Sequence, residues 1–281
     1  MRLRTLPVSV AGVIMAIAAA VCDGRFRLLP ALLCLAFAVL AQIASNFANE
    51  YYDFKAGIDR AGRTGPRRGV TEGDITPRAM KAATYATLAL ASAIGCSLIH
   101  WGGWWLLAVG TAIAVGVLAY SAGPYPLSRH GLGEVAVVFF FGVIPVNFTF
   151  YLLTGEFTVP VAWLSLSTGL MGANVLIVNN YRDYDDDRVV GKHTLAVMMG
   201  RRFAAALYLV NGLAAAALIV VYLAQSVGVG IAGMAVIAIY LAAHIAIWAR
   251  LVTLRGRRLN PLLGMTACNM LLTALLLLAS A

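Results

Sequence analysis

The chain has 281 residues, of which 61% are hydrophobic and only 12% are charged. Soluble domains carry about 25% charged residues. This composition, with a mean hydropathy of +0.84, therefore excludes a water-soluble globule and a disordered chain. The length is best counted in membrane spans of about 20 apolar residues each.

Apolar segments follow one another along the whole chain and predict an all-α polytopic membrane protein. Two long stretches, 82–128 and 203–249, contain no Lys, Arg, Asp or Glu, and each is long enough for two helices and a turn. Shorter apolar runs supply one further helix each. In chain order, the nine predicted spans cover about residues 6–22, 28–50, 79–99, 102–121, 134–154, 158–181, 203–224, 227–249 and 260–281.

The charged residues predict how this bundle is oriented. If the N-terminus is cytoplasmic, every Lys and Arg except Arg25 and Arg27 faces the cytoplasm, as the positive-inside rule requires. Nine spans then place the C-terminus outside. We therefore expect a multi-pass protein of the cytoplasmic (inner) membrane, and no nucleic-acid partner, because membrane topology explains the net charge of +9. The acids also gather on this side, which the rule does not require, so we expect the active site to face the cytoplasm.

Two segments, 49–53 and 179–183, share the pattern Asn-x-Tyr-x-Asp near the cytoplasmic ends of two predicted helices. The match indicates two weakly repeated parts, with Asp motifs near 46–59 and 179–187. Helical spacing places the polar residues of each motif on one helix face. These residues are Asn46, Asn49, Glu50 and Asp53 in the first motif, and Asn179, Asp183 and Asp187 in the second.

Carboxylates packed this tightly repel one another unless a divalent cation or opposing arginines hold them. Asp and Glu oxygens with a phosphate completing the shell are the usual Mg²⁺ arrangement, and Mn²⁺ is a possible substitute. The basic, glycine-rich loops at 55–77 and 188–202 can neutralise a phosphate-rich head group; alternatively, they set topology or contact anionic lipid. A ligand with a charged head and a long apolar tail fits both features: a prenyl diphosphate.

At this point the chain resembles the UbiA-type intramembrane prenyltransferases, and within them the dihydroxynaphthoate polyprenyltransferases of menaquinone synthesis. The resemblance spans nearly all of residues 1–281, as one UbiA-type membrane domain. It rests on a first Asp-rich motif at 49–59, on a second at 183–197, and on branch motifs at 2–7, 65–73, 120–126 and 131–135. Glu50 departs from the branch pattern, which usually has Asp there, and so do Leu3 and Arg4, where Pro and Lys are usual.

The resemblance implies nine helices around a central cavity that opens to the cytoplasm and laterally to lipid. It also implies Mg²⁺-dependent transfer of a polyprenyl group from polyprenyl diphosphate to 1,4-dihydroxy-2-naphthoate. The reaction releases CO₂ and diphosphate and gives demethylmenaquinone.

The resemblance also implies roles for individual residues. The implied metal ligands are Asn49, Asp53, Asp59, Asp183 and Asp187, and the implied diphosphate-binding residues are Arg2, Lys55, Arg67, Arg68 and Lys192. Asp53 and Asp183 count as catalytic, together with Tyr120 and Tyr125, the candidates for stabilising an allylic cation. Glu50, Asp185 and Asp186 are further acidic candidates.

Two other functions remain open from the sequence. The chain could be a UbiA-type transferase with a different acceptor, such as 4-hydroxybenzoate. A cation-coupled transporter would also use paired acidic clusters near an internal repeat. The position of the acids at one face, instead of at the middle of the membrane, argues against the transporter.

Overall fold

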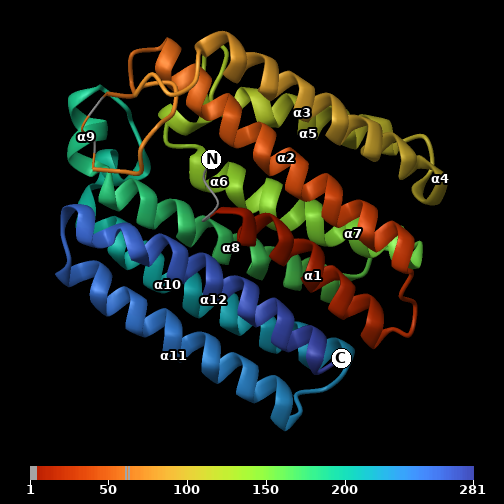
Figure 1. The fold of residues 1–281 in the computed structure, drawn as a ribbon. Coiled ribbons are helices and arrows are strands. Elements are labelled where there is room, and N and C mark those ends of the chain that lie inside the picture. Colours follow the sequence, from red (N-terminus) through yellow and green to blue (C-terminus); the bar gives the residue numbers. More distant parts are fainter. Residues whose placement is uncertain (1–4, 61, 63) are drawn as a thin grey trace.

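The computed structural model describes residues 5–60, 62 and 64–281, and its regular elements in this part are helical apart from one isolated bridge between His130 and His193. Figure 1 shows these helices packed side by side in one bundle. In chain order they are α1 (Leu6–Cys22), α2 (Leu28–Lys55), α3 (Pro77–Ser97), α4 (Ile99–Gly102), α5 (Leu106–Ala119), η2 (Leu127–Arg129), α6 (Gly133–Val137), η3 (Val138–Val143), α7 (Ile144–Thr154), α8 (Val159–Arg182), α9 (Tyr184–Val189), α10 (Leu195–Ser226), α11 (Ile231–Thr253), η4 (Gly256–Leu259) and α12 (Asn260–Ala279).

Seven helical segments in the described residues are long and apolar enough to cross a membrane. They are formed by α2, by α3 with α4, by α6 to α7, by α8, by α10, by α11, and by η4 with α12. The apolar helices α1 and α5 have 17 and 14 residues, fewer than the roughly 20 that span a bilayer. Each of the nine predicted segments contains a helix, and seven of them have the length of a span.

Helix α8 is the most enclosed of the seven. In its most apolar window 72% of the residues are buried, against 50% or less in each of the other six. Asn174 of α8 donates to the backbone oxygen of Tyr208 at 3.1 Å, and Ser167 donates to that of Ala215 at 2.8 Å. These bonds to α10 satisfy polar side chains that would otherwise be costly inside an apolar bundle.

Helix α8 also approaches the π-helical segment η3 unusually closely, because both carry glycine at the contact. A Cβ added to Gly142 would lie 2.3 Å from the Cα of Gly169, a distance that no side chain tolerates. The two backbones therefore touch directly, as small residues allow in membrane bundles. This contact fixes the segment from α6 to α7 against the centre of the bundle.

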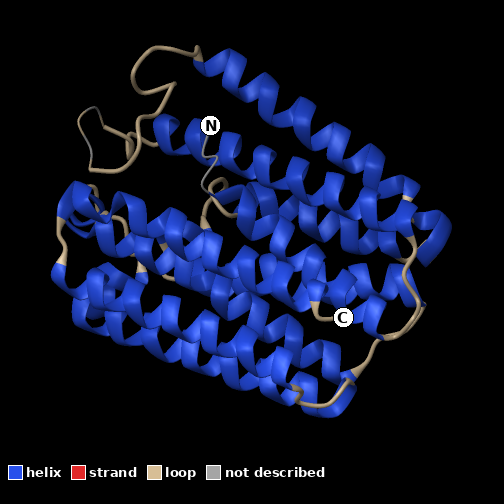
Figure 2. Cartoon of the chain, turned by 60° about the horizontal axis from the view of Figure 1, so that its bottom comes forward, coloured by secondary structure: helices blue, strands red, loops and turns tan. Residues whose placement is uncertain are grey.

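The C-terminal ends of α2 and α8 lie at the same end of the bundle. There the described part of the connection after α2, residues 56–60, 62 and 64–76, runs beside α9, while the C-terminus of the chain lies at the opposite end (Figure 1). Figure 2 shows the long loops gathered at this same end. The backbone N–H of Thr64 donates to Oδ2 of Asp186 at 2.9 Å, which joins the two connections directly. The two acidic motifs are thus brought together by the fold.

Candidate active site

The last turns of α2 carry the first acidic motif. Asn49, Glu50 and Asp53 are all buried there, and Asp59 is buried shortly after the helix ends. The C-terminal end of a helix carries the negative pole of its dipole, so carboxylates at this position require nearby cations.

Arg68 is the principal cation of the first motif. Its side chain is 2% exposed, with Nε 3.2 Å from Asp59 Oδ2 and Nη2 3.9 Å from Asp53 Oδ2. Nη2 also donates to Asn49 Oδ1 at 3.1 Å. Nη1 is buried without a hydrogen-bond partner among the described residues. A buried guanidinium with an unused donor is the feature expected where an anion binds.

Arg129 and Glu50 fasten the surrounding loops to this helix. Arg129 Nη2 lies 3.1 Å from Asp53 Oδ1 and also donates to the backbone oxygen of Ser121 at 3.2 Å. Glu50 Oε1 accepts a hydrogen bond from the backbone N–H of Val70 at 3.1 Å. Glu50 therefore positions the loop that carries Arg68.

The second motif begins with a compact local ion pair. Arg182, the last residue of α8, donates to both carboxylate oxygens of Asp183, with Nε to Oδ1 at 2.7 Å and Nη2 to Oδ2 at 2.8 Å. The same guanidinium donates to Asn179 Oδ1 at 2.9 Å and to Asn260 Oδ1 at 3.2 Å. Both charged side chains are almost completely buried. This arrangement locks the end of α8 to the start of α12.

The three aspartates that follow lie on the short helix α9 and point in different directions. Asp185 is exposed and pairs with Arg201 at 2.8 Å. Asp187 is buried, with Oδ1 3.6 Å from Lys192 Nζ. The N-terminal end of a helix favours negative charge, so α9 itself stabilises these carboxylates.

A charged cleft of about 650 Å³, open to solvent, separates the two motifs. Residues of the first motif form one wall, and residues of α9 and the loop after it form the other. Its charged lining residues are Asp53, Asp59, Arg60, Asp186, Asp187 and Lys192. The arrangement can bind a divalent cation and a polyanion together, because acids and bases alternate around one opening.

Three further cavities lie one beside another between this cleft and the apolar part of the bundle, and neighbouring cavities share lining residues. Lys192 lines the cleft and also a polar cavity of about 420 Å³ beside it. That polar cavity shares Asn49, Tyr120, Leu176 and Asn179 with a third cavity of about 630 Å³. The third shares Tyr120 and Gln42 with a fourth. Tyr120 therefore stands where polar and apolar space meet.

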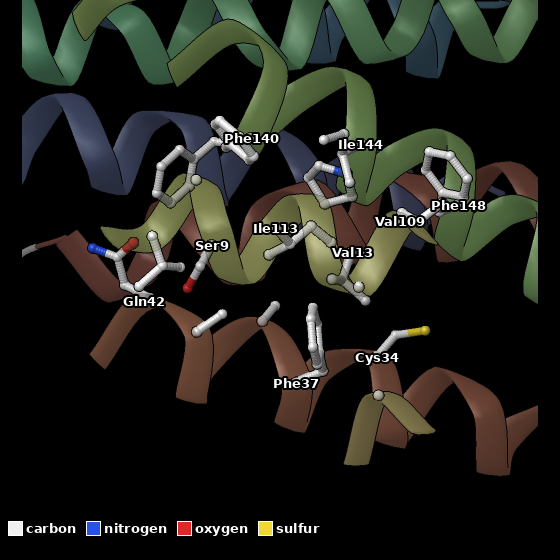
Figure 3. Close-up of a pocket in the computed structure, with 18 of the residues that line it drawn as sticks. Ser9, Val13, Cys34, Phe37, Gln42, Val109, Ile113, Phe140, Ile144 and Phe148 are labelled. Carbon is white, nitrogen blue, oxygen red and sulfur yellow. The ribbon is translucent and has the colours of Figure 1, made fainter. Parts of the chain in front are cut away.

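The fourth cavity is apolar and has a volume of about 1100 Å³. In Figure 3, Phe37 of α2 points into it from one side, while Phe140 and Ile144 approach from the other. Few polar side chains reach it; Ser9 and Gln42 are two of them. An apolar space of this size fits an isoprenoid chain whose head group occupies the charged cleft.

Several predicted site residues lie away from these cavities. Lys55 is exposed at the end of α2, and Arg67 is exposed and paired with Asp74 at 3.0 Å. Tyr125 is 58% exposed and stacks on His130, so it does not form the dry wall predicted for it. Arg2 lies outside the described residues. Of the predicted metal ligands, Asp53, Asp59 and Asp187 line the cleft, Asn49 lines the adjoining cavities, and Asp183 lines none of the four.

Three arginines of the site were not among the predicted residues. Arg182 stands inside the repeated pattern itself, immediately before Asp183, so the repeat could have indicated it. Arg60 follows Asp59 directly and lines the cleft. Arg129 gave no such signal, because only the fold brings it to Asp53.

The carboxylates fit a divalent cation only in company with a phosphate ligand. Within the described residues, no three His, Cys, Asp or Glu side chains are grouped closely enough to hold a metal ion by themselves. The cleft nevertheless presents acidic oxygens on both walls. Mg²⁺ usually binds through one or two carboxylates, with water and substrate phosphates completing its octahedron. The donor set therefore fits Mg²⁺ bound together with diphosphate.

Comparison with known proteins points to one family. The model of the UbiA prenyltransferase family matches residues 7–278. The 1,4-dihydroxy-2-naphthoate octaprenyltransferase of Escherichia coli (strain K12) is 36% identical over 206 residues, which cover 71% of this chain and 67% of that protein. The enzyme of the same name from Mycobacterium tuberculosis is 36% identical over 226 residues, covering 79% of this chain and 75% of that protein.

Solved structures share the fold at low sequence identity. The apo structure of a UbiA homolog from Aeropyrum pernix K1 has a TM-score of 0.76 at 18% identity and covers 100% of this chain and 99% of its own. A UbiA homolog from Archaeoglobus fulgidus, solved with GPP and Mg²⁺, has a TM-score of 0.67 at 16% identity, and the match covers 99% of both chains. Another structure of the Archaeoglobus fulgidus homolog holds Cd²⁺.

Proposed function

This chain belongs to the UbiA prenyltransferase family and is a transferase, and from that premise we propose the reaction that it performs. It transfers a polyprenyl group from polyprenyl diphosphate to 1,4-dihydroxy-2-naphthoate, with loss of diphosphate and CO₂, and gives the quinol form of demethylmenaquinone. One observation carries the proposal: a charged cleft and an apolar cavity of about 1100 Å³ are bridged by two neighbouring cavities that share lining residues with them, and three of the four cavities have Tyr120 in their lining.

The diphosphate belongs at the charged end of this path. Arg68 offers a buried and unused donor, and Arg60 and Lys192 line the cleft itself. When the allylic C–O bond breaks, negative charge builds on the departing diphosphate, and fixed cations stabilise it there. Bidentate guanidinium groups suit phosphate oxygens especially well.

The acids of the cleft would hold Mg²⁺, or Mn²⁺ in its place. Asp53 and Asp59 stand on one wall, and Asp186 and Asp187 on the other. When bound, the cation supplies positive charge to the diphosphate oxygens. Asp183 would position this site without contacting the cation, because its ion pair with Arg182 fixes the start of α9.

The prenyl carbon that reacts would lie beside Tyr120. Its aromatic ring presents electron density to the allylic cation, and the surrounding cavity keeps bulk water away. The acceptor ring then attacks through the carbon that carries its carboxylate. That carbon forms the new C–C bond, and the C–CO₂ bond breaks and returns its electron pair to the ring. The products are the prenylated quinol, CO₂ and diphosphate, and no base has to remove a proton.

The proposal includes the orientation of the bundle. Nine spans, with α1 and α5 as its short members, place the N-terminus and the charged cleft on the cytoplasmic side of the inner membrane. The two related halves form a single domain. The concentration of Lys and Arg at the α9 end supports this orientation. Arg25 and Glu156, paired at 3.0 Å, belong to connections on the opposite side.

Carboxyl-labelled acceptors test the proposal. Purified protein, given polyprenyl diphosphate, Mg²⁺ and carboxyl-labelled dihydroxynaphthoate, is expected to release one labelled CO₂ per prenylated product. Label retained in the product contradicts the proposal. Turnover of 4-hydroxybenzoate without turnover of dihydroxynaphthoate would assign the chain to another acceptor class, because that ring reacts at a C–H position and keeps its carboxylate.

A further inference from the structure

The polar cavity beside Tyr120 contains a carboxylate that the diphosphate site does not use. Glu134 is buried at the start of α6 and lines this cavity. Asp53, Asp59, Asp183 and Asp187 each pair with an arginine or a lysine. Glu134 makes no such close ion pair among the described residues: it accepts a hydrogen bond from the neutral amide of Asn180, with Nδ2 2.9 Å from Oε1, and Lys192 acts on it electrostatically.

A second polar group in the same cavity, the hydroxyl of Ser128, makes no hydrogen bond within the described residues. Ser128 is only 8% exposed. Its backbone N–H donates to the backbone oxygen of Tyr120 at 2.9 Å, so the hydroxyl is held close to the aromatic junction. Buried hydroxyl groups are normally satisfied, and an exception at a cavity wall indicates a ligand with polar atoms.

The cavity adjoins the junction at Tyr120. Gly133 lets Leu176 pack closely against the cavity wall, because a Cβ at this position would lie 3.0 Å from Leu176 Cδ2 and 3.7 Å from Tyr120 Oη. Tyr120 and Leu176 line both this cavity and the larger one next to it. A ring between them has Glu134 and Ser128 at its polar edge and the prenyl chain beyond Tyr120.

We infer that this cavity binds the edge of the aromatic acceptor that carries one hydroxyl and the carboxylate, with Glu134 accepting a hydrogen bond from that hydroxyl, which is next to the attacked carbon. The inference rests on the proposed function. A hydrogen bond from a phenolic hydroxyl to a carboxylate increases electron density in the ring, which favours attack on the allylic cation. Ser128 bonds to the same polar edge. The acceptor carboxylate, on the ring carbon next to that hydroxyl, lies beside Lys192, which lines the same cavity and interacts electrostatically with Glu134.

The main test pairs Glu134→Gln with an acceptor that lacks the relevant hydroxyl hydrogen. Glutamine keeps the size of the side chain and an oxygen for Asn180, and it removes the charge. We expect kcat/KM for dihydroxynaphthoate to fall about 10- to 100-fold, the range for a hydrogen bond to a charged group, with an unchanged KM for polyprenyl diphosphate. With the 1-methoxy analogue in place of dihydroxynaphthoate, kcat/KM of the unaltered protein is expected to fall by a similar factor. For Glu134→Gln, kcat/KM is expected to be nearly the same with either acceptor.

The inference would be overturned if the ratio of kcat/KM for the hydroxyl acceptor to that for the methoxy acceptor were the same in the unaltered protein and in Glu134→Gln. A Glu134 with a purely structural role would give that result. Glu156→Gln is the matched control: it makes the same chemical change in an exposed side chain and should leave both constants unaltered. If the unaltered protein prenylates hydroxybenzoate alone, the proposed function fails. The same comparison, run with hydroxybenzoate and its methoxy analogue, then still tests Glu134.

If Glu134→Gln does not fold, the variant Ser128→Ala provides a second test of whether the acceptor binds in this cavity. The Ser128 hydroxyl makes no hydrogen bond within the described residues, so its removal should leave the protein stable. We expect the acceptor KM to rise about 2- to 10-fold, as for loss of one neutral hydrogen bond. An unchanged acceptor KM in a folded Ser128→Ala protein would contradict the assignment of this cavity to the acceptor.

Discussion

The two acidic motifs share one sequence pattern, yet the structure uses them differently. Asp53 lines the charged cleft, and its cations, Arg68 and Arg129, come from two separate connections. Asp183, the matching residue of the second motif, pairs with its own neighbour Arg182 and lines none of the four cavities described. The second motif reaches the cleft about one turn later, through Asp186 and Asp187.

The difference follows from where each helix ends. Helix α2 continues to Lys55, so Asp53 lies within it and projects from the same face as Asn49. Helix α8 ends at Arg182, and Asp183 becomes the junction between α8 and α9. A shared pattern thus predicts proximity at one end of the bundle, whereas the role of each carboxylate depends on the local path of the backbone.

Removal of divalent metal should have the largest effect, because the proposed cation acts on both motifs at once. Protein stripped with EDTA is expected to lose essentially all turnover, and added Mg²⁺ or Mn²⁺ is expected to restore it. Product formation measured against metal concentration checks this. Full turnover in the presence of excess EDTA would show that the carboxylates serve only their arginine partners.

Asp53→Asn should reduce turnover by about 10²- to 10³-fold, the usual cost of removing one electrostatic group at a reacting centre. Its thermal midpoint should change little, because Arg68 keeps its contact with Asp59 and Arg129 keeps its hydrogen bonds to the backbone oxygens of Tyr52 and Ser121. Asp185→Asn is the matched control, since that carboxylate is exposed and pairs only with Arg201 at the surface. Similar small losses in both variants would remove Asp53 from the site.

Asp183→Asn should act mainly on stability. The change leaves the charge of Arg182 buried without its counter-ion, and breaking such pairs costs several kcal/mol; about 2 kcal/mol is expected here because asparagine still accepts a hydrogen bond. A lowered thermal midpoint in detergent, compared with Asp53→Asn, checks this. If Asp183→Asn melts like the unaltered protein and is inactive, Asp183 acts directly in the chemistry and the two motifs are equivalent.

Arg68→Lys and Arg67→Lys separate two adjacent arginines that the sequence could not distinguish. Lysine keeps the charge but not the planar fork that contacts Asp53, Asp59 and Asn49. We expect Arg68→Lys to raise the KM for polyprenyl diphosphate about 10-fold, a loss within the range for charge-assisted bonds. Arg67→Lys should be almost neutral, because Arg67 is exposed and pairs with Asp74. Equal effects would contradict the buried position of Arg68.

Much of the fold could be predicted from the sequence, because apolar runs between charged loops leave few arrangements in a bilayer. Each predicted span contains a helix in the structure, although α1 and α5 are short. The π-helical segment η3 was not predicted, and neither was the close contact between its Gly142 and Gly169 of α8. Sequence periodicity does not record contacts between distant backbones.

The site was predicted less completely. Helical spacing was enough to gather Asn49 and Asp53, but it could not tell which loop arginine turns inward. Tyr120 and Tyr125 are five residues apart in one motif, and only Tyr120 reaches the cavities. Glu134 also belonged to a recognised motif, and its place beside Tyr120 emerged only from the fold. Loop conformation and long-range packing decide these points.

The central claim is that one continuous path holds the diphosphate at the cleft and the prenyl chain in the apolar cavity. A structure determined with Mg²⁺ and a non-hydrolysable prenyl thiodiphosphate tests it most directly. We expect the diphosphate between Arg68 and the aspartates at 53 and 187, the first isoprene unit beside Tyr120, and the chain along Phe37 and Phe140. A diphosphate bound at exposed Lys55 or Arg67, or a chain outside the cavity of Figure 3, would contradict the claim.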